Sequence, residues 1–285
     1  MSAHIATLLV ACPDRKGLVA SLAQVLYGHG ANILDSDQHT DPIASMFFQR
    51  LRFDLSSLTT DRVSLENGIR EVGARFAMEW RLSYGERVRK VAIFASKLEH
   101  CLYDLLIRHR AGELACEIAM VISNHADAEP IARHFGVPFH HVPVTAETKE
   151  AAEASAHELI AAAGVELIVL ARYMQILSPG FVARYPASII NIHHSFLPAF
   201  VGANPYRQAY EKGVKMIGAT SHYVTADLDQ GPIIEQGTVR SSHRDSVDDL
   251  VRKGRDLEKR VLAQAVRDHL EDRILVYAGK TVVFD

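Results

Sequence analysis

Ser188-Ile189-Ile190-Asn191-Ile192-His193-His194-Ser195-Phe196-Leu197-Pro198 is the stretch of this chain that indicates both a fold and a site. Its first apolar residues predict a short buried strand, and an amide, two imidazoles and a hydroxyl follow directly. In an α/β sheet, polar residues at the carboxyl end of a strand face the crevice in which ligands bind. The stretch therefore predicts a chemical site at the end of such a strand.

A second polar cluster, Asp227-Leu228-Asp229-Gln230-Gly231-Pro232, places Asp229 38 residues after Asn191. Asn191 and His193 share one face of an extended strand, so both could donate to one carbonyl oxygen. Donors aimed at the oxyanion of acyl transfer are worth about 3–4 kcal/mol each. Asp229 would orient the imidazole and hold or deprotonate a water molecule. These three residues predict a metal-free acyl-transfer site.

His222 is the fourth candidate for this site. It lies in Ala219-Thr220-Ser221-His222-Tyr223-Val224, a predicted strand that could run beside the strand of Asn191. Asp227 has two readings, because it could bind a ligand or only shape the turn before Asp229.

Metal binding and a serine nucleophile are the rival readings of the same stretch. Further histidines are available at His140, His141, His194 and His243, but adjacent histidines in an extended segment point to opposite faces, and the chain has no His-x-x-x-His or Cys-x-x-Cys pair. Ser195 lacks the Gly-x-Ser-x-Gly elbow. We therefore expect no metal, and a structural or surface role for His194, His140 and His141.

The composition favours a small-molecule ligand. The 285 residues carry 31 basic and 34 acidic side chains without a Lys/Arg block, which gives little reason to expect a nucleic-acid partner. Met1-Ser2-Ala3-His4 shows no basic region before an apolar core, and no apolar run is long enough for a membrane span. We expect a cytoplasmic protein with no membrane partner, in which Cys12, Cys101 and Cys116 are reduced.

Two domains are expected, 1–85 and 86–285. Residues 4–84 read as strand, helix, strand, strand, helix, strand, which predicts a ferredoxin-like βαββαβ sheet. A polar, charged segment around Gly85 suits a linker. From Val91 onward short apolar strands alternate with helical stretches, which predicts a doubly wound, mostly parallel α/β domain. A long final helix, about 247–270, precedes two short strand-like runs at 274–277 and 281–284.

The first domain resembles an ACT regulatory domain. The resemblance is carried by Cys12-Pro13-Asp14-Arg15-Lys16-Gly17-Leu18-Val19 and by Gly30-Ala31-Asn32-Ile33 after the helix. It implies an amino-acid effector, with glycine and methionine as guesses, held near Asp14, Gly17 and Asn32, where a glycine lets backbone N–H groups approach a carboxylate. The alternative is that Gly17 only shapes a turn and the domain serves dimerisation.

The second domain resembles the 10-formyltetrahydrofolate-dependent formyltransferase family. The matching segments are Asn191-Ile192-His193, His222, Leu228-Asp229-Gln230-Gly231-Pro232-Ile233-Ile234, Ala171 to Ser178 and Val121 to Asn124. By resemblance, Asn191, His193 and Asp229 are catalytic, and His222 supports them. The same resemblance places the folate pterin against Met174, Gln175, Leu177, Thr225, Asp227 and Leu228. It implies that folate is the substrate and that no prosthetic group is needed.

One departure from the transferases concerns the acceptor. Glycinamide ribonucleotide formyltransferases carry a Gly-Ser-Asn loop that binds the acceptor phosphate, as nests of N–H groups do. This chain has Ala95-Ser96-Lys97-Leu98-Glu99-His100-Cys101-Leu102 instead. With the ACT-like domain and the segment His193 to Phe200, the chain resembles the deformylase branch of the family, in which water takes the formyl group. Hydrolysis would give formate and tetrahydrofolate, and so supply one-carbon and purine metabolism.

Two other functions remain open at this stage. One is formyl transfer to an amine acceptor, and the other is a non-catalytic amino-acid-binding regulatory protein. Arg172, Lys97 and Lys215 are candidates for binding the folate glutamate tail. Because ACT-like sheets often pair edge to edge, we expect a homodimer or homotetramer.

Overall fold

The computed structural model describes residues 4–198 and 205–285. Met1, Ser2, Ala3, Ala199 and Phe200, which contribute to the expectations above, lie outside the described residues. The chain forms two compact units. The first comprises residues 1–88, 271–277 and 282–285, and the second comprises residues 89–270 and 278–281.

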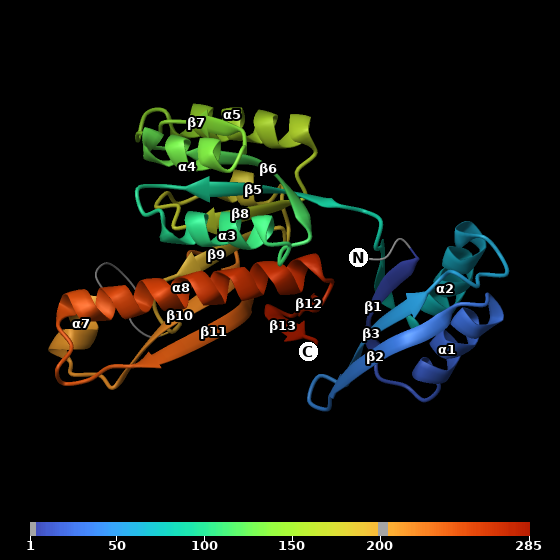
Figure 1. The fold of residues 1–285 in the computed structure, drawn as a ribbon. Coiled ribbons are helices and arrows are strands. Elements are labelled where there is room, and N and C mark those ends of the chain that lie inside the picture. Colours follow the sequence, from blue (N-terminus) through green and yellow to red (C-terminus); the bar gives the residue numbers. More distant parts are fainter. Residues whose placement is uncertain (1–3, 199–204) are drawn as a thin grey trace. The chain divides into compact units, whose positions relative to one another are not determined.

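The first unit is an antiparallel four-stranded sheet with two helices (Figure 1). Its apolar residues alternate along β1 and β3 and meet the buried leucines of α1 and α2 in one core. The sheet order is β2-β3-β1-β4, as the ferredoxin-like prediction requires. The elements are β1 (Ile5–Pro13), α1 (Leu18–Gly28), β2 (Asn32–Asp41), β3 (Met46–Asp54), α2 (Arg62–Phe76) and β4 (Glu79–Tyr84).

Residues from the end of the chain also belong to the first unit. The hairpin of β12 (Ile274–Tyr277) and β13 (Lys280–Val283) brings Leu275, Tyr277 and Phe284 against Leu9 and Phe48. These residues cover the part of the second face of the sheet around Leu9 and Phe48. The sequence prediction placed all of 86–285 in the second domain, whereas the structure groups residues 271–277 and 282–285 with the first.

The second unit is a seven-stranded sheet in the order β11-β10-β9-β8-β5-β6-β7. Strands β5 to β9 pair in parallel, while β10 is antiparallel to β9 and to β11. The mostly parallel α/β prediction is confirmed, although the sequence reading did not find β11. The elements are β5 (Arg89–Ala95), α3 (His100–Arg110), β6 (Cys116–Ser123), η1 (Ala126–Ala128), α4 (Glu129–His134), β7 (Phe139–His141), α5 (Lys149–Ala163), β8 (Leu167–Ala171), α6 (Pro179–Val182), β9 (Ile189–His193), α7 (Pro205–Glu211), β10 (Met216–Tyr223), β11 (Ile233–Arg240) and α8 (Val247–Leu270).

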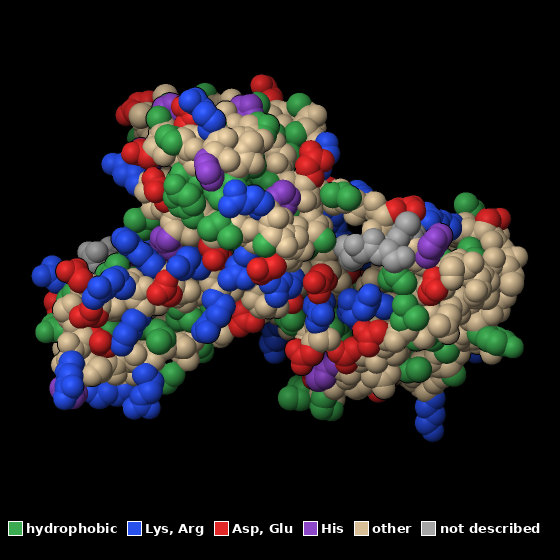
Figure 2. Space-filling model, viewed as in Figure 1, with side chains coloured by type: hydrophobic (Ala, Val, Ile, Leu, Met, Phe, Trp, Pro, Cys, Tyr) green, Lys and Arg blue, Asp and Glu red, His purple; other side chains and the backbone are tan. Residues whose placement is uncertain are grey.

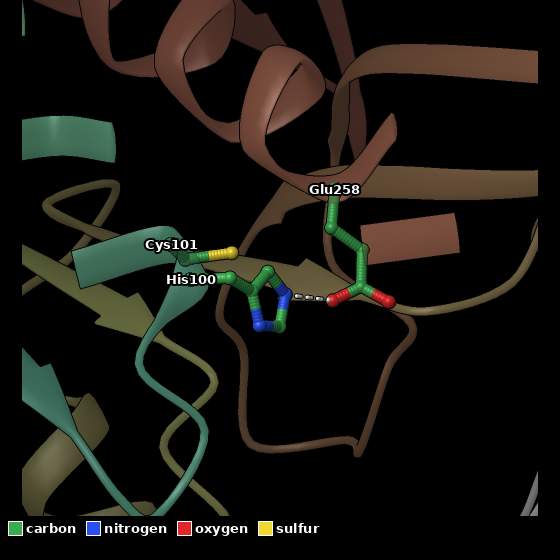
Figure 3. Close-up of side chains that lie close together, drawn as sticks. All are labelled: His100, Cys101 and Glu258. Carbon is green, nitrogen blue, oxygen red and sulfur yellow. Dashed lines mark hydrogen bonds and ion pairs between the residues drawn. The ribbon is translucent and has the colours of Figure 1, made fainter. Parts of the chain in front are cut away.

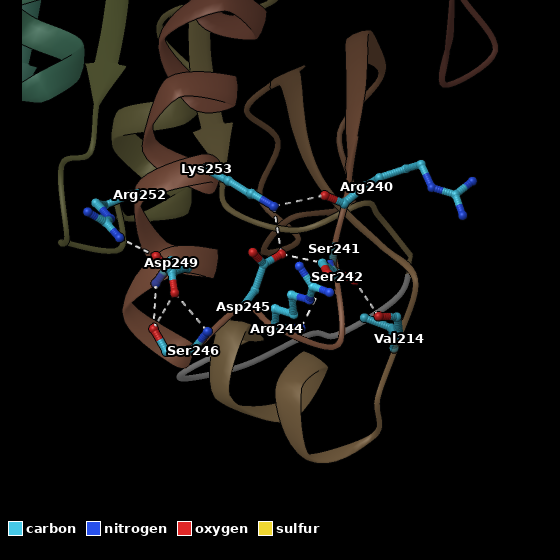
Figure 4. Close-up of polar contacts among 10 residues, drawn as sticks. All are labelled: Val214, Arg240, Ser241, Ser242, Arg244, Asp245, Ser246, Asp249, Arg252 and Lys253. Carbon is cyan, nitrogen blue, oxygen red and sulfur yellow. Dashed lines mark hydrogen bonds and ion pairs between the residues drawn. The ribbon is translucent and has the colours of Figure 1, made fainter.

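Helix α8 packs on β9, β10, β11 and α3 (Figure 1). Its start is fixed by a reciprocal cap, in which Asp249 N donates to Ser246 Oγ at 3.2 Å and Ser246 N donates to Asp249 Oδ2 at 2.9 Å (Figure 4). Lys253 Nζ lies 2.6 Å from Asp245 Oδ2 and extends the anchor into the preceding loop. Such caps satisfy the N–H groups that the first turn of a helix leaves without partners.

Charged side chains of both signs alternate along the outer face of α8, without a large patch of either sign (Figure 2). Within residues 4–198 and 205–285, none of the helices is both long enough and apolar enough to cross a membrane.

Candidate active site

Strands β9 and β10 bring Asn191 and His222 together as direct cross-strand partners. Asn191 Nδ2 lies 3.3 Å from His222 Nε2, and His222 Nδ1 lies 2.9 Å from the carbonyl oxygen of Tyr223. A carbonyl oxygen only accepts, so Nδ1 of His222 carries the proton. In the neutral ring Nε2 then accepts from the Asn191 amide, which fixes the orientation of that amide. The predicted pairing of these two strands is confirmed.

Asp229 reaches both imidazoles from the turn between β10 and β11. Its Oδ2 lies 3.2 Å from His193 Nδ1, and its Oδ1 lies 3.6 Å from His222 Nε2. The hydrogen bond from His193, and after it the contact with His222, hold the pKa of Asp229 well below its ordinary value despite partial burial. Asp229 is therefore a carboxylate at neutral pH, and it holds Nδ1 of His193 as the protonated nitrogen.

The turn that carries Asp229 has unusual backbone geometry. Asp229 itself has a left-handed φ of 56°, which costs energy for a residue with a side chain. Two residues later, a Cβ at Gly231 would stand 1.7 Å from the carbonyl oxygen of Tyr223. Only glycine therefore lets the turn approach β10 closely enough to deliver the carboxylate.

His193 Nε2 is the free atom among the side chains of Asn191, His193, His222 and Asp229. It is buried, and it has no hydrogen-bond partner among the described residues. Because Nδ1 is held by Asp229, Nε2 is the nitrogen that can exchange a proton or a hydrogen bond with a ligand. An amide, an imidazole and a carboxylate thus meet at one point, and this set can stabilise an oxyanion and move a proton.

These residues open into a cavity of about 590 Å³ in the second unit. Such a volume suits a drug-sized ligand. The residues predicted to bind the pterin line it, namely Met174, Gln175, Leu177, Thr225 and Leu228. Asp227 is not among the lining residues, and its carbonyl oxygen accepts from Thr225 Oγ1 at 3.1 Å. Met174 and Leu228 are both 59% exposed, so the cavity offers apolar surface to a flat ring.

The loop after β5 is built differently from a phosphate-binding loop. Ser96 is buried, and its hydroxyl donates to Asn124 Oδ1 at 2.6 Å and accepts from the Met174 N–H at 3.0 Å. The hydroxyl of Ser96 thus joins the ends of β5, β6 and β8 instead of pointing to a ligand.

The sequence reading missed a buried polar network in the same cavity, which we call the Glu258 network (His100, Arg172, His194, Tyr206 and Glu258). Glu258 Oε2 lies 2.8 Å from His100 Nε2 and 3.5 Å from Arg172 Nε, and Tyr206 donates to Oε1 at 2.6 Å. Burial works to raise the pKa of Glu258, but these partners outweigh it and the pKa lies below its ordinary value. In the sequence, the only signal for Glu258 was its place on the four-residue repeat that forms the buried face of α8.

His194, expected to have a structural or surface role, belongs to this network. Arg172 Nη1 lies 2.6 Å from His194 Nδ1. Burial and the charge of Arg172 lower the pKa of His194 to about 4. Arg172, a candidate for the glutamate tail, has a side chain that is only 9% exposed and already faces Glu258, while Lys97 and Lys215 are exposed.

His100, Cys101 and Glu258 also lie close enough together to hold a metal ion (Figure 3). Burial, and after it the charge of Glu258, raise the pKa of the Cys101 thiol well above its ordinary value. Metals bind the thiolate, and Glu258 is already engaged by Arg172 and Tyr206. The donor set therefore suits a carboxylate network better than a metal.

In the first unit, the residues expected to hold an effector are exposed: Asp14, Gly17 and Asn32. Gly17 has a φ of 93° and precedes the first turn of α1. That conformation favours glycine, and it leaves the N–H groups of α1 without a side-chain cap.

Comparison with known proteins finds a matching family model for each of the two predicted domains. The model of the ACT domain matches residues 6–76, and that of the formyl transferase family matches residues 89–266. A formyltetrahydrofolate deformylase of Synechocystis sp. is 52% identical over 279 residues, which cover 98% of each chain.

Solved structures agree with these matches. A crystal structure of a formyltetrahydrofolate deformylase from Pseudomonas syringae has a TM-score of 0.96 and 46% identity, and the match covers 100% of this chain and 96% of that one. Glycinamide ribonucleotide transformylase 1 from Symbiobacterium toebii has a TM-score of 0.67 and 34% identity, and the match covers 72% of this chain and 98% of that one.

Proposed function

The chain belongs to the formyltetrahydrofolate deformylases of the formyl transferase family, and we propose that it hydrolyses 10-formyltetrahydrofolate to formate and tetrahydrofolate. One observation carries the assignment of the site. Asp229 holds Nδ1 of His193, and the opposite nitrogen of this ring is buried, without a partner among the described residues, in a cavity of about 590 Å³.

The reaction begins with water attacking the formyl carbon, which creates a tetrahedral oxyanion. Asn191 Nδ2 donates to the negative oxygen, and His193 Nε2 becomes a second donor once it has taken the proton of the attacking water. The bond between the formyl carbon and N10 then breaks, N10 takes one proton of the attacking water, and the product leaves as formic acid, which releases the other proton to solvent and becomes formate. No group other than water and these side chains is needed for the balance of atoms.

Proton transfer follows from the pair His193 and Asp229. The carboxylate stays ionised and stabilises positive charge on His193 as the ring takes the proton of the attacking water. The ring then returns this proton to N10 as general acid. His222, whose Nδ1 proton is held by Tyr223, keeps the Asn191 amide oriented and contributes a second contact to Asp229.

In the proposed complex, the pterin of the substrate lies against the side chains of Met174, Gln175, Leu177, Thr225 and Leu228. Apolar lining and backbone polar groups are the usual means of holding a flat heterocycle. Asp227 contributes through its backbone, because its carbonyl oxygen closes the turn that carries Leu228 and Asp229.

Incubation with 10-formyltetrahydrofolate and no amine tests the activity directly. We expect formate and tetrahydrofolate to appear in equal amounts. No turnover in water alone, together with turnover when an amine acceptor is added, would replace the deformylase by a transferase. Folate binding without turnover under either condition would favour a regulatory protein.

The ACT domain, we propose, binds a small amino acid at the loop of Gly17, and the chain assembles as a homodimer or homotetramer in the cytoplasm. The exposed start of α1, with N–H groups not capped by a side chain, supports a carboxylate ligand. Calorimetric titration with glycine and methionine tests the effector, and no heat with either would remove both. Light scattering tests the assembly.

A further inference from the structure

The Glu258 network ends at the catalytic imidazole. His194 accepts from Arg172, and its ring stacks on that of His193 with centroids 5.1 Å apart and planes 28° apart. A guanidinium only donates, so Nδ1 of His194 is unprotonated and the neutral ring carries its proton on Nε2. Arg172 is in turn held by Glu258. The position of the His194 ring beside His193 is therefore fixed from the protein interior.

His194 and Tyr206 stand between two cavities. Both residues line the cavity of about 590 Å³ that holds the catalytic residues, and both also line a smaller one of about 30 Å³. The smaller cavity is otherwise bounded, among the described residues, by Ser195, Phe196, Ala209, Met216, Ile217 and Gly218. The two rings, whose centroids are 6.2 Å apart, thus lie between the cavity of the catalytic residues and the smaller one.

The buried charge of this region is already neutralised. The Arg172 side chain is 9% exposed and that of Glu258 is 1% exposed. Burying such a pair costs desolvation energy that a packed apolar wall would avoid. A phosphorylated acceptor would have to compete with Glu258 for Arg172. The Glu258 network is therefore better suited to holding one wall of the cavity in place than to binding an anionic ligand.

We propose that His194 is a specificity-determining residue that confines the nucleophile to water. This inference rests on the proposed hydrolysis. Water and an amine would attack the same formyl carbon, break the same bond to N10 and leave a proton on N10, and they differ only in size and in the product, formate or a formamide. The His194 ring, anchored through Arg172 and Glu258, fills the space that an amine would need. Specificity of this kind comes from excluding the competitor.

The test measures how the formyl group divides between water and hydroxylamine, a small amine nucleophile. The wild-type protein, given 10-formyltetrahydrofolate and hydroxylamine, is expected to give formate almost entirely. His194→Ala removes a ring that lines both cavities, and we expect its ratio of N-hydroxyformamide to formate to rise by about tenfold or more, the scale of discrimination by one group in a pocket. Both products are quantified by mass spectrometry.

Two matched variants separate size from other effects. His194→Gln keeps most of the volume and a donor, and Tyr206→Phe keeps the ring but loses the bond to Glu258, so both should keep the wild-type ratio. An unchanged ratio in folded His194→Ala, or an equal rise in His194→Gln, would overturn the proposal. Formate release by the wild-type protein in the same experiments tests the proposed hydrolysis separately from the role of His194. A wild-type protein that released no formate would refute the hydrolysis itself, whatever the variants did.

Discussion

Asp229→Asn tests the central pair of the site with little change of shape. An asparagine can turn its oxygen to Nδ1 of His193, now 3.2 Å from Oδ2, and its NH₂ to Nε2 of His222, now 3.6 Å from Oδ1. The lone pair of His222 Nε2 already accepts from the Asn191 amide, so the new NH₂ stays beside this nitrogen without replacing that hydrogen bond. The variant therefore keeps the hydrogen bond to His193 and removes one negative charge.

The distance sets the size of the effect. A unit charge 3.2 Å from a positively charged His193 is worth about 5 kcal/mol at an effective dielectric constant of about 20. At about 1.36 kcal/mol per tenfold in rate, this upper limit approaches 10⁴-fold. General acid–base groups contribute about 10²–10⁴-fold, so we expect kcat to fall within that range while binding of the product tetrahydrofolate stays within about threefold.

Formate release under saturating substrate gives kcat, and a fluorescence titration with tetrahydrofolate gives the dissociation constant. Thermal unfolding of the variant checks that the fold is intact. A kcat within tenfold of the wild type would refute the role of the Asp229 charge. A loss of tetrahydrofolate binding as large as the loss of kcat would show instead that Asp229 holds the ligand.

Three further predictions concern the turn, the network and α8. Gly231→Ala should lower kcat by at least about 10²-fold, because the turn must move to relieve the 1.7 Å contact with Tyr223, and misplacing a catalytic group by an ångström costs that much. Gly28→Ala is the matched control, since the added methyl group meets nothing within 4 Å. Equal kcat values in the two variants would contradict the reasoning. The pKa of His194 is about 4 in the folded protein and 6.5 for an ordinary histidine, so between these pH values only the unfolded chain takes up the proton. The free energy of unfolding is therefore unaffected above pH 6.5 and falls as the pH is lowered to 4, by about 2 kcal/mol between pH 7 and 4.5. Urea unfolding of His194→Gln should lack this loss. Ser246→Ala removes the reciprocal cap with Asp249 and should lower the free energy of unfolding in urea by about 1 kcal/mol; an unchanged urea midpoint would show that the cap contributes nothing.

The sequence was sufficient for the parts of the fold that rest on local patterns. Short apolar runs separated by helical stretches predicted most strands of both sheets, and a long final helix was predicted where α8 lies. It was not sufficient for β11, whose residues are mostly half-buried or exposed and show no strict alternation. It also could not place residues 271–277 and 282–285, because only tertiary packing against Leu9 and Phe48 shows that they belong to the first unit.

The same distinction applies to the candidate site. Asn191, His193, His222 and Asp229 lie on strand ends and one turn, where a short motif specifies the geometry, and they meet in the structure as the spacing suggested. Nothing comparable marks Glu258, a single carboxylate among many charged residues of α8. Its partners come from α3, α7 and the end of β8, so no local pattern joins them.

Energetics nevertheless single the network out once the structure is known. A buried ion pair is rarely the most stable way to fill a core, because desolvation offsets its attraction, and packed apolar residues often do as well or better. Arg172 also has a left-handed φ of 61°, a further local cost. The buried ion pair and the left-handed backbone of Arg172 are two energetically unfavourable features at one wall of the cavity. One hydrogen bond connects them to the ring that stacks on His193. Control of the reaction explains them better than stability does. If so, replacing Arg172 and Glu258 together by apolar residues of similar size should leave the unfolding free energy unchanged or raise it, while allowing hydroxylamine to capture the formyl group; a double variant that still gave only formate would show that the wall needs no anchor.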